Sequence, residues 1–186
     1  MSKNVYSAKI EIFLKELNVS DVSKNYVSWL NDYEIVKYTE QKYKKHTLKN
    51  VKSFVFEKRK SKNEFLYGIY LKKNFTNKVK KKNNQQHVGN IKLGVINFHH
   101  KYADISYFVG DKRVWGKGIA TKAIAAIIKI AAKKFKLKKL IAGAYAKNIG
   151  SIRVLEKNNF VKEAILKDKL LFQKKRHDHI LYGLII

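Results

Sequence analysis

The stretch WGKGIAT at residues 115–121, called the elbow below, determines how the rest of this sequence is interpreted. Two glycines flank a lysine there, and apolar residues then recur at helical spacing to about Phe135. The first N–H groups of a helix lack intrahelical partners, and the helix dipole adds partial positive charge at that end. Because glycine lets a ligand approach the backbone closely, we predict an anion site, best suited to phosphate, at the start of a helix. The predicted apolar stripe of this helix comprises Ile119, Ala120, Ala123, Ile124, Ile127, Ile130 and Ala131.

Two familiar nucleotide-binding motifs do not fit the elbow. A Walker loop requires Ser or Thr after its Gly-Lys pair, whereas Gly118 follows Lys117 here. A dinucleotide fingerprint requires a small third residue, where Thr121 stands, and an acidic residue about 20 positions further on, where the sequence has lysines. The glycines alone could also form nothing more than a tight turn between a strand and a helix, so the elbow by itself leaves both interpretations open.

Hydrophobic periodicity predicts one mixed α/β domain over residues 1–186. Strands are predicted at 9–17, 65–73, 87–98, 102–110 and 139–146, with a terminal hairpin over 164–186. Helices are predicted from a cap at Ser20 or Asp21 to Leu30, over 47–60 with Thr47 as cap, from the elbow to Phe135, and within 148–160. The polar stretch 74–86 is predicted to be a hairpin loop.

Composition limits the class of protein. A chain of 186 residues that is 45% hydrophobic is large enough to bury one core. It shows no apolar run of membrane-spanning length, no secretion-signal pattern and no cysteine. We therefore expect a cytoplasmic protein without a membrane span, disulfides or thiolate chemistry.

The formal net charge of +27 raises the question of an anionic partner. Only four of the 41 basic residues are arginine, the residue best suited to bidentate recognition of phosphate and guanine. The sequence shows no aromatic-bearing basic strand motif and no recognition helix. A nucleic-acid-binding module is therefore the alternative function from another class, and a solvated basic surface is the simpler explanation of the charge.

The order of the motifs resembles that of the GNAT superfamily of acyl-CoA-dependent N-acyltransferases. The strand ADISYFVGD (103–111), the elbow, its helix and the strand KLIAGAYA (139–146) follow one another, and an N-x-x-S…F pattern comes next at Asn148, Ser151 and Phe160. In that family the elbow reads [QR]-x-x-G-x-[GA], and its backbone N–H groups hold the pyrophosphate of acetyl-CoA.

Two frames of that family motif fit the elbow. The frame 113–118 fits literally, whereas the frame 115–120 has Trp115 in the first place. We prefer 115–120, because this form is typical of the branch that resembles ribosomal-protein N-terminal and amino-sugar acetyltransferases. WLND at 29–32, followed by VKY at 36–38, is usual in the same branch.

The resemblance implies a mixed, mostly antiparallel central sheet that is flanked by helices and splayed at the acyl-CoA site. It implies acetyl-CoA as co-substrate, no metal, and direct attack of an amine on the thioester in a ternary complex, for which no cysteine is needed. By this resemblance the acetyl-CoA contacts come from Phe108, Val109, Gly110, Gly116, Lys117, Gly118, Ile119, Ala120, Thr121, Asn148 and Ser151. Asn148 is expected to orient an amide or the amine, and Ser151 is a candidate cap of the next helix.

The proton-transfer groups are less well defined. In many relatives a tyrosine seven residues after the Asn is the acid that protonates the leaving thiolate. Leu155 stands at that position here. Asp104 occupies a strand position that is often acidic in relatives, and His100 has a pKa better matched to a general base. We therefore name Asp104, His100 and Asn148 as catalytic candidates. Weaker alternatives for the base are His99, Tyr102 and Tyr107.

The acceptor amine is the least determined part of the reaction. We place a nucleotide-linked amino sugar first and the α-amine of a protein second, both from the same family branch. Polyamines are disfavoured because a chain with a net charge of +27 repels them. Trp29, Asn31 and Tyr107 are the expected acceptor-binding residues, and the sequence leaves a homodimer open.

Overall fold

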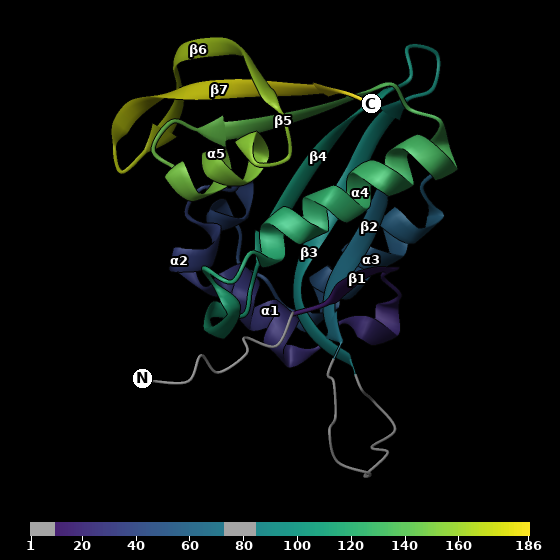
Figure 1. Cartoon of the computed structure of the whole chain (residues 1–186). Coiled ribbons are helices and arrows are strands. Elements are labelled where there is room, and N and C mark those ends of the chain that lie inside the picture. The colour runs from purple at the N-terminus through teal and green to yellow at the C-terminus, as the bar shows by residue number, and fades with distance from the viewer. Residues whose placement is uncertain (1–9, 73–84) are drawn as a thin grey trace, which may run out of the picture.

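The computed structural model describes residues 10–72 and 85–186 (Figure 1). The strands are β1 (Ile12–Glu16), β2 (Phe65–Lys72), β3 (Gln85–Asn97), β4 (Tyr102–Val109), β5 (Lys139–Tyr145), β6 (Val161–Phe172) and β7 (Lys175–Ile185). The α-helices are α1 (Lys24–Asn31), α2 (Tyr33–Val36), α3 (Leu48–Lys60), α4 (Ile119–Phe135) and α5 (Ile149–Glu156). Short 3-10 helices are η1 (Val19–Asp21), η2 (Glu40–Tyr43) and η3 (Lys112–Val114).

The strands form one seven-stranded sheet in the order β1-β2-β3-β4-β5-β7-β6. All neighbouring strands are antiparallel except β4 and β5, which lie side by side in the same direction. A parallel connection needs a crossover, and α4 supplies it between these two strands. The expected mixed, mostly antiparallel sheet flanked by helices is thus confirmed.

Two hydrophobic clusters pack on opposite faces of the sheet. Alternate residues of a strand point to opposite faces, and in β2 Tyr67 and Ile69 join one cluster while Leu66 and Tyr70 join the other. The first and larger cluster contains the buried residues of α4 and α5, and the second contains those of α1 and α3. The sheet is therefore covered by α4 and α5 on one side and by α1 and α3 on the other (Figure 1).

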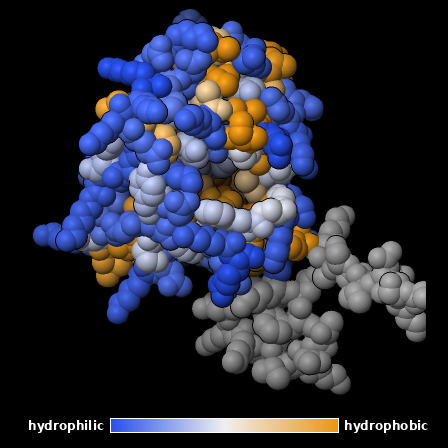
Figure 2. Space-filling model, turned by 90° about the vertical axis from the view of Figure 1, so that its left-hand side faces the viewer, coloured by the Kyte–Doolittle hydropathy of each residue, from blue (hydrophilic) through white to orange (hydrophobic). Residues whose placement is uncertain are grey.

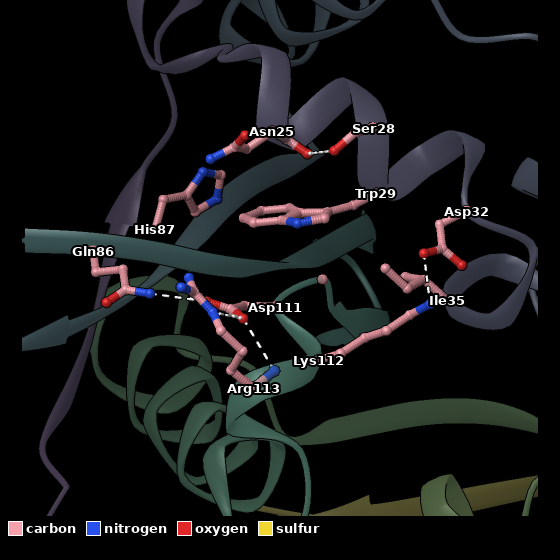
Figure 3. A pocket seen from close by; sticks show the side chains of 11 residues that line it. Asn25, Ser28, Trp29, Asp32, Ile35, Gln86, His87, Asp111, Lys112 and Arg113 are labelled. Atoms are coloured by element: carbon pink, nitrogen blue, oxygen red, sulfur yellow. Dashed lines mark hydrogen bonds and ion pairs between the residues drawn. The ribbon is translucent and has the colours of Figure 1, made fainter.

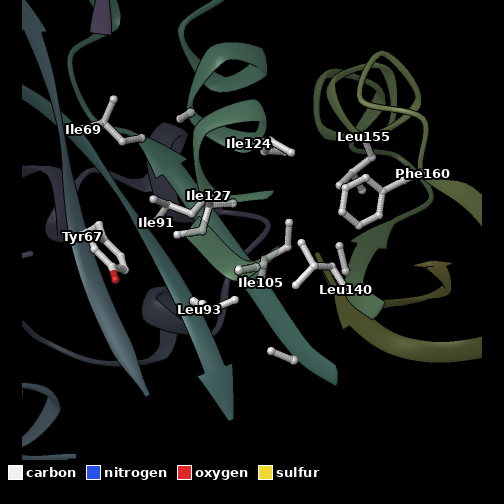
Figure 4. Packing of buried hydrophobic residues seen from close by; sticks show 14 of the residues in the cluster. Tyr67, Ile69, Ile91, Leu93, Ile105, Ile124, Ile127, Leu140, Leu155 and Phe160 are labelled. Carbon is white, nitrogen blue, oxygen red and sulfur yellow. The ribbon is translucent and has the colours of Figure 1, made fainter. Parts of the chain in front are cut away.

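The apolar stripe of α4 forms the centre of the larger cluster (Figure 4). Ala123, Ile124 and Ile127 are fully buried, which confirms the predicted core face of the helix. Leu155 of α5 is also fully buried and lies beside Phe160 in the same cluster. The position at which relatives carry a tyrosine therefore belongs to the core of this protein.

Most element boundaries agree with the sequence predictions, with four differences. Ser23 caps α1 in place of Ser20 or Asp21, whereas Thr47 caps α3 as predicted. Helix α2, capped by Asp32, was not predicted, because four residues carry too little periodicity. The hairpin strand β6 begins at Val161 instead of 164. The predicted loop 74–86 falls mostly on residues 73–84, outside the described residues, and its last two residues belong to β3.

None of the helices within 10–72 and 85–186 combines the length and the apolarity that crossing a bilayer requires.

Candidate functional site

The central feature of the site is the divergence of β4 from β5. The two strands pair only at Tyr102–Lys139, Ala103–Leu140 and Asp104–Ile141. Beyond this point β4 continues to pair with β3 as far as Val109, and β5 continues to pair with β7 as far as Tyr145. The facing edges of β4 and β5 are consequently unpaired over their last residues, which opens a wedge in the sheet. An unpaired strand edge is able to take up an extended ligand as an added strand.

The elbow lies at the open end of this wedge and starts α4. Gly116 and Gly118 both have φ of 74°, a left-handed conformation that favours glycine, and Gly118 is the N-cap of the helix. A Cβ atom added at either glycine would have no atom within 4 Å. Trp115 fixes the loop, because its indole N–H donates a hydrogen bond of 2.8 Å to the carbonyl of Val109. No side chain caps α4 in the described structure, so its first N–H groups have no side-chain partner there.

A cleft of about 470 Å³ joins the wedge to the elbow. Seen from the side on which α2, α5 and the start of α4 lie, the surface has a hollow with hydrophobic atoms inside and hydrophilic side chains around it (Figure 2). The predicted residues that line the cleft are Tyr107, Phe108, Val109, Gly116, Gly118, Ile119, Ala120, Thr121, Asn148 and Ser151. Of the predicted acetyl-CoA contacts, only Lys117 and Gly110 are not among its lining residues.

Three of these residues form a polar cluster at the wall of the cleft. The Asn148 carboxamide oxygen accepts the Ser151 N–H at 3.2 Å, so Asn148 caps α5, a role that we had assigned to Ser151. The Ser151 hydroxyl is instead hydrogen-bonded to the Tyr107 hydroxyl at 2.8 Å. Burial raises the pKa of Tyr107 to about 12, against the opposing effect of the Ser151 hydrogen bond. Tyr107 is thus protonated at neutral pH and can donate a proton, but it is unsuited to act as a base.

The cleft also has basic residues that the sequence analysis did not assign to the site. Arg153 and Lys157 lie four residues apart along α5 and its end, and both line the cleft together with Lys37. The spacing of four, which places two side chains on one side of a helix, was the signal available in the sequence. The cleft therefore combines a helix N-terminus with several cations, a setting that favours a polyanionic ligand.

A second cavity, of about 570 Å³, lies between α1, the start of β3 and η3 (Figure 3). Trp29 and His87 form its aromatic side, with their ring centroids 5.2 Å apart, and Asn25, Ser28 and Gln86 add polar groups. Burial lowers the pKa of His87, so its imidazole is neutral at neutral pH. The predicted acceptor residue Trp29 therefore belongs to this cavity.

The two cavities are neighbours, because Ile35 lines both of them. Gly110 lines the second cavity, and a Cβ atom there would lie 2.2 Å from the Trp29 ring. Its N–H donates to the Val88 carbonyl at 2.8 Å and is therefore engaged in the sheet. The structure thus places Gly110 against Trp29 and away from the acetyl-CoA contacts that we predicted for it.

Opposite charges along the rim of the second cavity are paired with each other (Figure 3). Arg113 donates two parallel hydrogen bonds to Asp111, Nε to Oδ1 at 2.9 Å and Nη2 to Oδ2 at 2.7 Å. Gln86 donates a further bond of 2.8 Å to the same carboxylate. Lys112 forms an ion pair of 2.6 Å with Asp32. The charge of Arg113 is therefore compensated by Asp111.

The two candidates for the base, Asp104 and His100, lie in different surroundings. Asp104 lies where the strands diverge, and partial burial raises its pKa against the opposing effect of Lys92. His100 lies in the exposed turn before β4, where its N–H is bonded to Asn97. At about 3.3 Å per strand residue, Tyr102, the first strand residue after this turn, lies roughly 16 Å from Tyr107 along β4. Figure 1 shows the β3–β4 turn near the end of α4, away from the elbow.

Asn31, the third predicted acceptor residue, has a structural role. Its amide donates to the carbonyls of Val27 at 3.0 Å and His46 at 2.8 Å, and its oxygen accepts the His46 N–H at 2.9 Å. Asn31 therefore fixes the end of α1 to the segment before α3.

Within 10–72 and 85–186 no group of three or more His, Cys, Asp or Glu side chains is placed to hold a metal ion.

Comparison with known proteins identifies the architecture. Residues 11–161 match the family model described as "Acetyltransferase (GNAT) domain". A curated relative, "Probable N-acetyltransferase YjcK" of Bacillus subtilis, is 37% identical over 83 residues, and the match spans 45% of this chain and 45% of that protein. The chain thus matches less than half of that relative's length.

Solved structures share the whole fold at low sequence identity. Spermidine N-acetyltransferase from Vibrio cholerae, solved in complex with CoA and spermine, has a TM-score of 0.78 at 16% identity. The match covers 94% of this chain and 95% of that chain. A GNAT-family acetyltransferase from Bacillus anthracis has a TM-score of 0.75 at 21% identity, and the match covers 95% of this chain and 96% of that chain.

The Asp111–Arg113 pair predicts a pH-dependent contribution to stability. Hydrogen bonds from Arg113 hold the pKa of Asp111 below its usual range, with burial acting in the opposite direction. A lowered folded-state pKa stabilises the fold above the unfolded-state pKa, and this stabilisation is lost as the pH falls through the folded-state value. Asp111→Asn should therefore lower the free energy of unfolding at pH 7, and its difference from wild type should shrink below about pH 4. Urea unfolding across this range measures it.

Asp168→Asn is the matched control, because among the described residues the Asp168 side chain makes no ion pair. It should leave the unfolding free energy nearly unchanged at every pH. A difference for Asp111→Asn that stays constant from pH 7 to pH 3 would contradict the assignment of an ionised, paired carboxylate.

Proposed function

The chain belongs to the GNAT family of acetyltransferases, and from this premise we propose that it transfers the acetyl group of acetyl-CoA to the primary amine of a small acceptor. The observation that carries the proposal is the elbow, whose two left-handed glycines and uncapped helix N-terminus lie at the open end of the wedge between β4 and β5. Among relatives, "Probable N-acetyltransferase YjcK" is named for the same activity.

The residues present fit acetyl-CoA. The N–H groups from Gly118 to Thr121 would hold the pyrophosphate, in the space that a side chain at Gly118 would otherwise occupy. Arg153 and Lys157 would bind the remaining phosphate charge, since both line the same cleft. The free edge of β4 at Phe108 and Val109 would pair with the extended pantetheine arm.

Acetyl-CoA supplies an activated acyl group as a thioester, and the protein supplies position and charge. A backbone N–H near Phe108 or Val109 would stabilise the negative charge that develops on the carbonyl oxygen. The Tyr107 hydroxyl, protonated at neutral pH and held by Ser151, would donate the proton that the departing thiolate requires. Tyr107 then takes the role that the buried Leu155 cannot perform.

Asp104 remains our proposed base for the acceptor amine. It lies at the apex of the wedge, and its raised pKa moves the carboxyl toward the neutral range in which a base is most effective. Along β4, Asp104 and Tyr107 point to opposite faces of the sheet, because they are three residues apart. The base and the acid would thus act on the incoming amine and the leaving thiolate from opposite sides.

We propose a nucleotide-linked amino sugar as the acceptor, bound in the second cavity. Trp29 offers an apolar face on which a sugar ring can stack, while Asn25, Ser28 and Gln86 offer hydrogen-bonding groups. Lys112 at the rim supplies positive charge for a diphosphate, although part of it is taken up by Asp32. The shared wall at Ile35 would let an amine reach from this cavity toward the wedge.

A polyamine is the second candidate acceptor, favoured by the fold similarity to the spermidine N-acetyltransferase from Vibrio cholerae. The net charge of +27 opposes it, because long-range repulsion lowers the local concentration of a polycation. We expect kcat/KM for nucleotide-linked amino sugars to exceed that for spermidine by at least about tenfold, measured as CoA release at physiological salt. The reverse order of kcat/KM would replace the amino sugar by the polyamine.

Substitution of Gly118 tests the acetyl-CoA site. Gly118→Val places a branched side chain in the pyrophosphate space and also strains a left-handed residue, so acetyl-CoA affinity should fall by at least about 100-fold, or roughly 3 kcal/mol. Gly118→Asn places a side chain in the same space, but asparagine tolerates the left-handed conformation. Both variants should lose affinity in calorimetric titrations, and only Gly118→Val should also lose stability. Wild-type affinity in Gly118→Asn would contradict the elbow assignment.

Tyr107→Phe tests the proposed acid. Removal of the hydroxyl should lower kcat by about 100-fold, the usual lower contribution of general acid catalysis, and leave acetyl-CoA affinity unchanged. Tyr102→Phe is the matched control at the other end of β4, and it should retain wild-type kcat. If Tyr107→Phe and Tyr102→Phe have equal kcat, the thiolate is protonated by another group.

A further inference from the structure

One lysine ammonium is surrounded by aromatic rings at the junction of η2, β5 and the β6–β7 hairpin. The Lys42 Nζ lies 4.9 Å from the ring centroid of Tyr43, 4.6 Å from that of Tyr145 and 5.2 Å from that of Phe172. It also donates hydrogen bonds to the Tyr145 hydroxyl at 2.9 Å and to the Lys37 carbonyl at 3.1 Å. We call the three rings the Lys42 cage.

The cage holds this cation without an acidic partner. Other lysines of the same region are paired with carboxylates, such as Lys37 with Glu34 at 2.7 Å and Lys112 with Asp32 at 2.6 Å. No carboxylate of residues 10–72 or 85–186 lies within ion-pair distance of the Lys42 Nζ. A cation held by aromatic rings and neutral oxygens is similar to the arrangement with which proteins recognise an alkylammonium ligand.

The cage is connected to the acetyl-CoA cleft through one residue. Tyr38 lines the cleft, and its ring centroid lies 5.6 Å from that of Tyr145 and 5.1 Å from that of Phe172. Tyr145 is the last residue of β5, the strand that forms one edge of the wedge. An ammonium in the cage would thus lie one ring away from the place where the acceptor amine must react.

Building on the proposed acetyl transfer to an amine, we propose that the Lys42 cage is an alkylammonium subsite of the acceptor side and that Lys42 fills it as a tethered competitor. A second cationic group of a diamine would have to displace Lys42 in order to bind. A tethered group competes at an effective concentration on the order of millimolar, so weakly binding cations are excluded. Lys42 then determines specificity, because it rejects cationic acceptors and leaves anionic ones unaffected.

A structural tie is the competing explanation of the same contacts. Tyr43 donates a hydrogen bond of 3.1 Å to the Leu171 carbonyl, so η2 and the hairpin are joined independently of Lys42. If Lys42 only strengthens this junction, its removal lowers stability and creates no binding site. If Lys42 is a competitor, its removal creates a site for a free cation.

Calorimetric titration of butylammonium, without acetyl-CoA, distinguishes these outcomes. Lys42→Ala vacates the cage and should bind butylammonium at least tenfold more tightly than wild type. Lys44→Ala is the matched control, because it removes the same charge from an exposed neighbouring side chain. Lys42→Arg should bind like wild type, since a guanidinium also occupies aromatic cages. Equal butylammonium affinity in Lys42→Ala and Lys44→Ala overturns the proposal.

A measurement on the wild-type protein covers the case in which Lys42→Ala does not fold. Reductive methylation followed by peptide mass spectrometry reports the accessibility of each lysine. Saturating tetramethylammonium, which does not react, should raise the methylation rate of Lys42 at least threefold and leave that of Lys44 unchanged. An unchanged Lys42 rate overturns the proposal.

Kinetics separate this inference from the proposed function. In Lys42→Ala, KM for 1,4-diaminobutane should fall at least fivefold, while KM for a nucleotide-linked amino sugar stays the same. The butylammonium and methylation results do not depend on acetyl transfer. If the protein shows no acetyltransferase activity but Lys42→Ala binds butylammonium, the proposed function is overturned and the cage proposal stands.

Discussion

The limited pairing of β4 with β5 is the constraint on which the rest of the site depends. Each of the two strands keeps an antiparallel partner on its other side, β7 for β5 and, with a bulge between Leu93 and Ile96, β3 for β4. The sheet therefore remains intact on both sides while the two strands separate after three residue pairs. The crossover through α4 places a helix N-terminus at the open end of the resulting wedge. A strand edge and a helix N-terminus, both with free N–H groups, thus face the same cleft.

The parts of this arrangement that follow local rules could be predicted from the sequence. The stripe of α4 has a period that predicts burial, and Gly116 and Gly118 occupy the left-handed positions where glycine is favoured. The order of strand, elbow, helix and Asn148 led to predicted acetyl-CoA contacts most of which line the cleft. In each case the information lies within a few residues of the feature that it predicts.

The parts that depend on long-range contacts could not be predicted in this way. Nothing near Asp111 in the sequence indicates that Gln86, 25 residues earlier, donates a hydrogen bond to its carboxylate. The pattern of β4 also does not show that the turn before this strand lies away from the cleft. Helix α2 is too short to carry a period, although it and the residues that follow it as far as Thr39 form a wall of the cleft. The ordinary pKa of histidine suggested His100, but only the fold shows that it lies in the turn before β4, at the other end of this strand from Tyr107.

The segment from α2 to η2 connects the two sides of the proposed reaction. Ile35 separates the cleft from the second cavity, and Tyr38 separates the cleft from the Lys42 cage. Within α2 only Val36 is buried, so this wall is held by fewer core contacts than α4. The donor site, in contrast, is built on β4, α4 and α5, whose residues belong to the main core. In the proposed reaction, the residues that separate donor from acceptor thus lie in a thin wall, whereas those that hold the donor are part of the packed sheet.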